Sequence, residues 1–255
     1  MTDHGILMKR EMVRAYLADR KWMTRRTRNL GAINKNPSDW KLHSVSEKGA
    51  FFTSISNPQL HYWSKLPYGW IGDILWVRET WRIIGWSEDG DWLIEYADGT
   101  SKWFESAEEV DEETFIRYWE QCTIDCEKAG IPIGDDDNFH FDDEHPCPTR
   151  WRPSIHLPRW ASRVSMSVGN VRVERLYAIT RADIDAEGTP PVPNQMSYKN
   201  DNYQRFKDFR YLWNSINAKR GMGWDVNPWI WVYEFPKFSK LESTVCLQEN
   251  DVAKR

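Results

Sequence analysis

The sequence predicts an α+β protein whose sheet curls into a mixed β-barrel with flanking helices. Several short segments have the apolar or alternating pattern of strands, and others repeat apolar residues at the spacing of a helix. The two kinds of segment are mixed along the chain, which is typical of α+β packing. The chain also contains 16 Trp, 10 Tyr and 10 Phe, so either its core is built from large rings or a groove stacks on bases.

Length and charge limit the organisation. The 255 residues are enough for one generous domain, which we expect over residues 1–240, with an insertion at about 106–148 and a flexible charged tail at 241–255. The formal net charge is −4, so any contact with nucleic acid must be local. We find no apolar run of signal-peptide or membrane-span length and therefore expect a cytoplasmic protein without membrane partners.

The N-terminal third is predicted to hold one helix and few strands. Apolar residues recur at helical spacing over 8–17, which ends just before Lys21. Residues 31–65 mix polar and aromatic residues without a clean period, so we interpret them as mostly loop with one strand at 50–53. An apolar strand then follows Gly72-Asp73 and ends at Arg78 and Glu79.

The middle of the chain predicts a hairpin and a helix. Segments 92–96 and 102–105 flank Asp98-Gly99 closely enough to form a β-hairpin. From Asp111 an apolar stripe at helical spacing predicts a helix that ends before Gly130. The acidic stretch 135–144 follows as a solvated loop, and this helix and loop form the expected insertion.

The C-terminal part contains further strands and helices. Residues 164–173 alternate as two strands or one bent strand, and 182–187 predict a short helix before a glycine. A helical stripe over 206–216 is followed by a glycine at 221. The segment 229–235 is apolar on both faces, which is the pattern of a central strand.

The most functional-looking stretch is Lys21-Trp22-Met23-Thr24-Arg25-Arg26. Lys21 and Thr24 are three positions apart, so on a helical turn or tight loop both side chains would face one point in space. A lysine can act as a base if burial or nearby cations lower its pKa, and Arg25 and Arg26 are nearby cations. The alternative is a basic loop that holds phosphates.

Three segments resemble the ASCH family, and more closely the large tryptophan-rich ASCH proteins of bacteriophages and prophages. They are the helix leading into Lys21–Arg26, the run GDILWVRETW at 72–81, and the strand NPWIWV at 227–232. The similarity extends from about residue 6 to 235. It implies a PUA-like β-barrel with a cleft suited to a nucleobase or short RNA. A phage-encoded protein would act in the cytoplasm of the bacterial host.

Some small ASCH proteins are amidohydrolases that remove the acyl group from N4-acetylcytidine with a Lys, a Thr and a Glu. Lys21 and Thr24 match the first two by spacing, and Glu79 is the best match for the third because it follows the Gly-Asp strand. The resemblance thus implies a metal-independent amidohydrolase that uses no cofactor and acts on a nucleoside or RNA. A binding module for RNA or modified nucleotides, and an ASCH-type ribonuclease, are the alternatives.

The chemistry of this trio is consistent with amide hydrolysis. Thr24 would attack the carbonyl, and Lys21 would pass its proton to the leaving amine. Glu79 would orient Lys21, although an ionised carboxylate beside the lysine raises its pKa and could leave it as a charged oxyanion stabiliser. A rim ion pair between Glu79 and Arg78, Arg25 or Arg26 is an equal alternative.

Substrate contacts are expected from arginines and tryptophans. Guanidinium groups bind planar anions through paired hydrogen bonds, so Arg25, Arg26 and Arg78 are candidate clamps. Trp76 and Trp81 could stack on a base, but large rings more often fill a core.

A zinc site is a less favoured alternative. The candidate ligands fall within 26 positions and are Cys122, Cys126, His140, His145 and Cys147. Two of the cysteines lie on the apolar stripe of the predicted helix, where buried thiols need no metal. We therefore expect no metal, and we expect these three cysteines and Cys246 to be free thiols.

Overall fold

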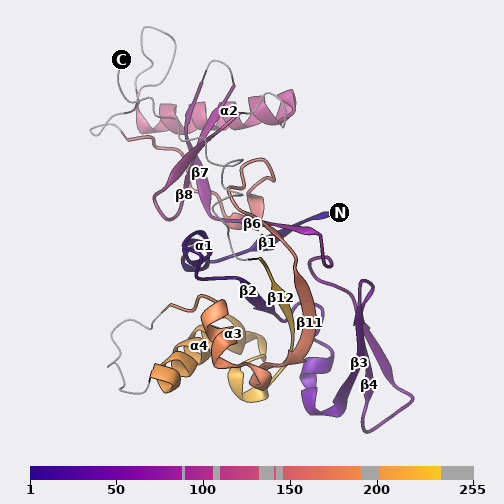
Figure 1. Ribbon diagram of the computed structural model, residues 1–255. Helices are drawn as coiled ribbons and strands as arrows, with labels where there is room; N and C mark the ends of the chain where they lie inside the picture. The colour runs from indigo at the N-terminus through magenta and orange to yellow at the C-terminus, as the bar shows by residue number, and fades with distance from the viewer. Residues whose placement is uncertain (88–89, 106–109, 132–140, 142–145, 191–200, 237–255) are drawn as a thin grey trace. The chain divides into compact units, whose positions relative to one another are not determined.

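The computed structural model describes residues 1–87, 90–105, 110–131, 141, 146–190 and 201–236. These residues form an α+β protein of short strands and a few helices (Figure 1). The chain divides into two compact units, which are described separately. Unit 1 contains residues 1–4, 11–75 and the chain from 166 onward, and unit 2 contains 5–10 and 76–165.

The strands are short, whereas two of the α-helices have 18 and 17 residues. The strands are β1 Asp3–Leu7, β2 Met23–Arg26, β3 Trp40–Ser46, β4 Gly49–Ser54, β5 His61–Ser64, β6 Ile74–Arg78, β7 Trp81–Trp86, β8 Trp92–Tyr96, β9 Ser101–Phe104, β10 Ser165–Ser167, β11 Asn170–Arg175 and β12 Trp229–Glu234. The α-helices are α1 Arg10–Leu17, α2 Glu112–Ala129, α3 Arg181–Ala186 and α4 Asp201–Asn217.

The central strand of unit 1 is β12, as its two-sided apolar pattern predicts. It lies between β11 and β2 in an antiparallel sheet, and its first five residues are all buried. One face of the sheet, with Ile230 and Val232, packs on α3 and α4 through Phe209 and Trp213 (Figure 1). The predicted helices at 182–187 and 206–216 are confirmed and cover this face.

Residues 31–65 hold more strand than expected: the strand predicted at 50–53 is confirmed, but the rest is not mostly loop. They contain β3, β4 and β5, which form a three-stranded antiparallel sheet in unit 1. A β-bulge between Leu42 and Ser44 shifts the register and breaks the period of β3. Phe51 and Trp63 point to the less buried face, so the apolar residues do not mark the core side.

Unit 2 is built on a second three-stranded meander, β7-β8-β9, which contains the predicted hairpin. Its core joins Trp81, Trp92 and Tyr96 to Cys122 of α2. The predicted helix at 111–129 is confirmed. Asp111 caps its N-terminus by accepting a hydrogen bond from the Thr114 amide, and it ends in the left-handed conformation at Gly130 (φ +73°).

The remaining sheet has the order β1-β6-β10 and includes the predicted strand after Gly72-Asp73. Residues 164–173 form two strands in different sheets, β10 and β11. The described strands thus fall into four three-stranded sheets, and among them no sheet closes into a barrel. Most of the acidic stretch 135–144 and the whole tail 241–255 lie outside the described residues.

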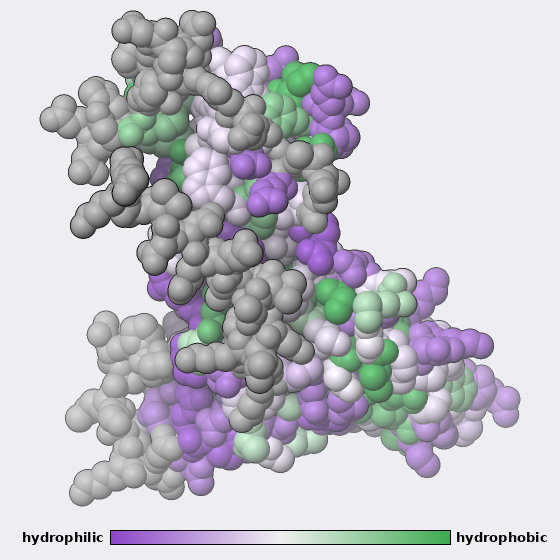
Figure 2. All heavy atoms as spheres, turned by 45° about the horizontal axis from the view of Figure 1, so that its top comes forward, coloured by the Kyte–Doolittle hydropathy of each residue, from purple (hydrophilic) through white to green (hydrophobic). Residues whose placement is uncertain are grey.

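The surface is mixed in character. On the face drawn in Figure 2, hydrophilic residues predominate and hydrophobic ones form small patches among them. None of the described helices is both long and apolar enough to cross a bilayer. Cys122, Cys126 and Cys147 are buried free thiols, as expected, and Cys246 lies outside the described residues.

Candidate functional site

Thr24 lies on a strand and Lys21 lies just before it, so the helical turn that was one of the two expected arrangements does not form. Residues 23–26 form β2, at the edge of the β11-β12-β2 sheet. Side chains alternate along a strand, so Thr24 lies opposite Tyr233 on one face, and Arg25 lies opposite Val232 on the other. Three-residue spacing therefore does not bring Lys21 and Thr24 to one face in the way that a helix would.

Lys21 is almost wholly buried, and its amine makes three hydrogen bonds. Nζ donates to the carbonyl oxygen of Met23 at 2.6 Å, to the carbonyl oxygen of Glu187 at 3.0 Å and to Glu187 Oε2 at 3.0 Å. The side chains of Lys21 and Glu187 are only 1% and 8% exposed. Three acceptors match the three donors of an ammonium group, so this pair is a desolvated and fully hydrogen-bonded ion pair.

The end of α3 brings Glu187 to the lysine. Glu187 caps the C-terminus of α3 with its amide on the Asp183 carbonyl, and Gly188 follows in the left-handed conformation (φ +65°). A Cβ on Gly188 would lie 2.8 Å from Lys21 Cβ and 2.9 Å from Ala15 Cβ. Glycine is therefore required there both for the turn and for the close approach of Lys21.

Arg25 ties the same carboxylate into a larger ion network. Its guanidinium contacts Glu187 at 3.2 Å, Glu174 at 3.1 Å and Asp183 at 3.2 Å, with its side chain 1% exposed. Arg172 extends the network because it pairs with Glu174 and Asp183. Arg25 therefore spends much of its hydrogen-bonding capacity inside the protein, on carboxylates rather than on a ligand.

Burial lowers the pKa of Lys21 from its ordinary value, because the ammonium loses its hydration. The Glu187 carboxylate raises this pKa through its charge and hydrogen bond, and Arg26 and Arg25 lower it further. The balance favours a lysine that gives up its proton more easily than one in water. That is the property a general base requires.

The backbone of β2 fixes the position of the Lys21 amine. Phe235 donates its amide to the Trp22 carbonyl, so in an antiparallel ladder the Met23 carbonyl points away from β12. Lys21 Nζ binds that carbonyl and so lies on the side of β2 away from β12, where it is buried against Glu187. Thr24 itself is 4% exposed.

Glu79, the predicted third catalytic residue, belongs to unit 2. It pairs with Arg163, whose Nη2 lies 2.7 Å from Glu79 Oε2 and 2.8 Å from Asp98 Oδ2. The Arg163 guanidinium also stacks over Tyr96 at 4.1 Å from the ring centroid. Thus the carboxylate in contact with Lys21 is Glu187, whereas Glu79 is paired with Arg163, which is none of the three arginines that the sequence suggested as its partners.

The predicted substrate-binding residues divide between the units. In unit 1 Arg26 lies opposite Trp231 on β2. In unit 2 Arg78 lies over the ring of Trp76, with its guanidinium carbon 4.6 Å from the centroid. Trp81 is fully buried and makes edge contacts with neighbouring rings in the core of that unit. It therefore occupies the core position that was the alternative to stacking on a base.

The proposed zinc ligands are only partly described. Cys147 Sγ lies 3.7 Å from the Ile83 carbonyl and 3.5 Å from the hydroxyl of Thr149. Burial raises the pKa of Cys122 and of Cys126 to about 12, which keeps both as neutral thiols. His140 and His145 lie outside the described residues, and no cluster of metal-ligating side chains occurs within the part that is described.

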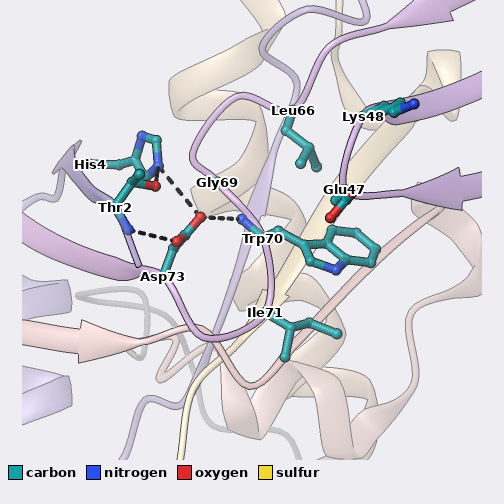
Figure 3. Close-up of a pocket in the computed structure, with 9 residues that line it drawn as sticks. All are labelled: Thr2, His4, Glu47, Lys48, Leu66, Gly69, Trp70, Ile71 and Asp73. Atoms are coloured by element: carbon teal, nitrogen blue, oxygen red, sulfur yellow. Dashed lines mark hydrogen bonds and ion pairs between the residues drawn. The ribbon is translucent and has the colours of Figure 1, made fainter.

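An open pocket of about 580 Å³ lies elsewhere in unit 1 (Figure 3). Asp73 is fixed on its wall because Oδ1 accepts the Thr2 amide at 2.8 Å and Oδ2 accepts the Trp70 amide at 2.9 Å. The hydrogen bonds from these two backbone amides lower the pKa of Asp73, and the one from Trp70 has the largest effect. Gly69 must be glycine, because a Cβ there would lie 2.6 Å from the His4 ring. Asp73 is thus held as a carboxylate that organises the turn.

Sequence reasoning missed Glu187 and Arg163, the partners of Lys21 and Glu79. Glu187 was recognised only as the last residue of a short helix before a glycine. That cap was the available signal, because the residue ending a helix beside a tight turn is held in a defined direction. Arg163 had no local signal. Comparisons with family models, with curated proteins and with solved structures found no match to the chain.

Proposed function

We propose that this protein is an amidohydrolase that removes the acyl group from an acylated nucleobase or nucleoside of the N4-acetylcytidine type. The observation that supports it most is the buried contact of 3.0 Å between Lys21 Nζ and Glu187 Oε2 beside the strand that carries Thr24. The resemblance to ASCH proteins supplies the set of Lys, Thr and Glu and a PUA-like fold. Contact with Lys21 makes Glu187, rather than Glu79, the carboxylate of our scheme.

In this scheme Thr24 is the nucleophile. Once the Lys21 ammonium has lost a proton to solvent, Thr24 Oγ attacks the acyl carbonyl carbon, and the Lys21 amine takes the hydroxyl proton as the new O–C bond forms. Lys21 then gives that proton to the leaving exocyclic amine as the C–N bond breaks. Water hydrolyses the resulting ester on Thr24 and regenerates the hydroxyl. No metal takes part in these steps.

Glu187 and the Met23 carbonyl have a positioning role. They hold Lys21 Nζ beside β2, and Arg25 shares the Glu187 carboxylate with it. The lowered pKa of Lys21 predicts that kcat rises with pH, with an apparent pKa below the value of about 10.4 for an ordinary lysine.

The test is incubation with N4-acetylcytidine, as free nucleoside and within a short RNA, with release of cytidine measured by chromatography. We expect Thr24→Ala to lower turnover by about 10²- to 10⁴-fold, while Thr24→Ser retains much of it. Lys21→Arg preserves the charge but not the base, so it should also lose turnover. Glu79→Gln is the matched control, because Glu79 pairs with Arg163 in the other unit.

Unchanged turnover in Thr24→Ala would remove the nucleophile and the scheme with it. The second candidate is a binding module without catalysis, in which Lys21 and the arginines would hold phosphates. The pairing of Lys21 and Arg25 with carboxylates inside the protein leaves these two cations little capacity for that role. A protein that releases no cytidine, and whose salt-dependent RNA binding is weakened by Lys21→Met, would select this second function.

A further inference from the structure

The outer face of the β3-β4-β5 sheet carries a row of aromatic rings, which we call the aromatic row. It consists of His43 from β3, Phe51 from β4, and His61 and Trp63 from β5. Phe51 is the centre, with its ring centroid 5.7 Å from that of His43, 5.4 Å from that of His61 and 5.9 Å from that of Trp63. Three neighbouring strands thus present rings at stacking distance from one another.

Alternation along β4 places this row on the solvent side. Ala50, Phe52 and Ser54 are buried, so Phe51 between them faces outward. Trp63 lies directly opposite Phe51 in the register and is 46% exposed. Its indole Nε1 donates to the Lys48 carbonyl at 3.0 Å, which fixes the ring while leaving much of it in water.

The segment that forms this sheet is slightly basic, although the whole chain is negative, and the register places one of its lysines on the face of the rings. Within residues 40–65 the sequence has three lysines, at 41, 48 and 65, and one carboxylate, Glu47, which gives a net charge of +2 against −4 for the chain. Lys41 is exposed and pairs with Thr53, whose hydroxyl lies 3.2 Å from His61 Nδ1. Lys41 therefore shares the face of the rings.

The other three-stranded meander shows that this combination is not a general feature of the fold. Trp103 of β9 is similarly exposed, at 49%, and lies opposite Leu93. The charged side chains on the adjacent strands, Arg82 and Glu95, pair with each other at 2.5 Å. That sheet therefore offers an exposed indole but no comparable local excess of positive charge.

We propose that the aromatic row and Lys41 bind single-stranded nucleic acid. Bases would stack on Phe51 and Trp63, whose flat rings accept any base, and the lysines would attract the phosphates. A double helix is a poorer ligand because its bases are already stacked. This binding is separate from the chemistry proposed at Lys21 and does not depend on it.

Fluorescence anisotropy with labelled oligouridylate and oligothymidylate of about ten nucleotides tests this proposal. We expect the wild type to bind the single strands more tightly than a duplex of equal length. Phe51→Ala and Trp63→Ala should each weaken binding about 5- to 150-fold, since one stacked base contributes about 1–3 kcal/mol. Trp63→Phe keeps a flat ring and should restore most of the affinity.

Two control variants, Trp103→Ala and Lys21→Met, and one charge variant, Lys41→Gln, make the result specific. Trp103→Ala removes an equally exposed indole from the other meander and should bind like the wild type. Lys41→Gln should lower the salt dependence of the affinity by about 0.7 in the log–log slope, as expected for one lost phosphate contact on a single strand. Lys21→Met should bind normally, which separates this face from the proposed hydrolase.

The proposal is overturned if the wild type binds no oligonucleotide or binds the duplex equally well. It is also overturned if Phe51→Ala and Trp63→Ala, shown by circular dichroism to be folded, bind as tightly as Trp103→Ala. Equal affinity for oligouridylate and oligothymidylate supports recognition by stacking. A preference for oligouridylate supports recognition of RNA through its 2′-hydroxyls.

Discussion

Each unit buries a cluster of ion pairs, and the two clusters differ in the cation at their centre. In unit 1 an ammonium, that of Lys21, meets Glu187 at 3.0 Å, and in unit 2 a guanidinium, that of Arg163, meets Glu79 at 2.7 Å. Burial acts to lower the pKa of Arg163, but its bonds to Glu79 and Asp98 outweigh burial and raise it. The pKa of Lys21 is lowered instead.

This difference sets the two clusters apart in how readily their central cation can lose a proton. An arginine stays charged at any pH that the fold survives, whereas a buried lysine changes its pKa readily. Of the two clusters, the one around Lys21 is therefore the better suited to pass a proton between a hydroxyl and an amine. Burial of a carboxylate with a cation is thus no sign of catalysis by itself, and the identity of the cation is what distinguishes the two clusters.

The largest effect is expected in unit 2. Arg163→Met would leave Glu79 and Asp98, with side chains 5% and 2% exposed, buried without their cation. We expect the free energy of unfolding to fall by about 3–5 kcal/mol, measured by urea denaturation. Arg210→Met is the control, because Arg210 and Asp225 form an exposed pair, and its cost should be about 0–1 kcal/mol. Equal costs would show that the Arg163 cluster is not a buried ion network.

A smaller loss of stability is expected in unit 1. Lys21→Met removes the ammonium, but Arg25 Nη1 remains 3.2 Å from Glu187 Oε1 and continues to neutralise that carboxylate. The free energy of unfolding should therefore fall by about 1–3 kcal/mol, the range for a buried group that loses one of its partners. Urea denaturation measures this as well. A cost as large as that of Arg163→Met would mean that Arg25 does not compensate for the lost lysine.

Much of the fold could be predicted because the apolar pattern that identifies a helix or a strand lies within that one segment of the sequence. The two-sided apolar run that became β12 and the capped stripe that became α2 carry their signals within one element. Only β4 of the meander β3-β4-β5 was predicted, because that signal assumes apolar residues inside. Phe51 and Trp63 face outward there, and the bulge in β3 interrupts the alternation.

Only the part of the candidate site that lies on one short segment could be predicted from the sequence. Lys21, Thr24 and Arg25 are neighbours in the sequence and were found together. The carboxylate that meets Lys21 is 166 positions away, and nothing local to either residue specifies that pairing. The choice of Glu79 followed its place at the end of a strand, but the long-range packing of α3 against β2 is what brings Glu187 to the lysine.

The smallest predicted effect is on the loss of stability as the pH falls. It compares Asp98 of the unit 2 cluster with Asp183 of the unit 1 cluster. Burial acts to raise the pKa of Asp98, but the bonds from Arg163 and Thr100 outweigh it and lower the pKa to about 2. An unfolded aspartate has a pKa of about 3.9, so the unfolded state takes up the proton first as the pH falls. The contribution of Asp98 is therefore present above about pH 4 and is lost between about pH 4 and 2.

We expect this contribution to be on the order of 1 kcal/mol after solvent screening, and Asp98→Asn should remove it. Urea denaturation at a series of pH values measures it as the difference between the wild type and the variant. The pKa of Asp183 in the unit 1 cluster is also lowered, because bonds from Thr180 and the charges of Arg25 and Arg172 outweigh burial. Asp183→Asn should therefore also reduce the dependence of the free energy of unfolding on pH in this acid range. If neither variant changes that dependence, both carboxylates titrate normally in the folded protein.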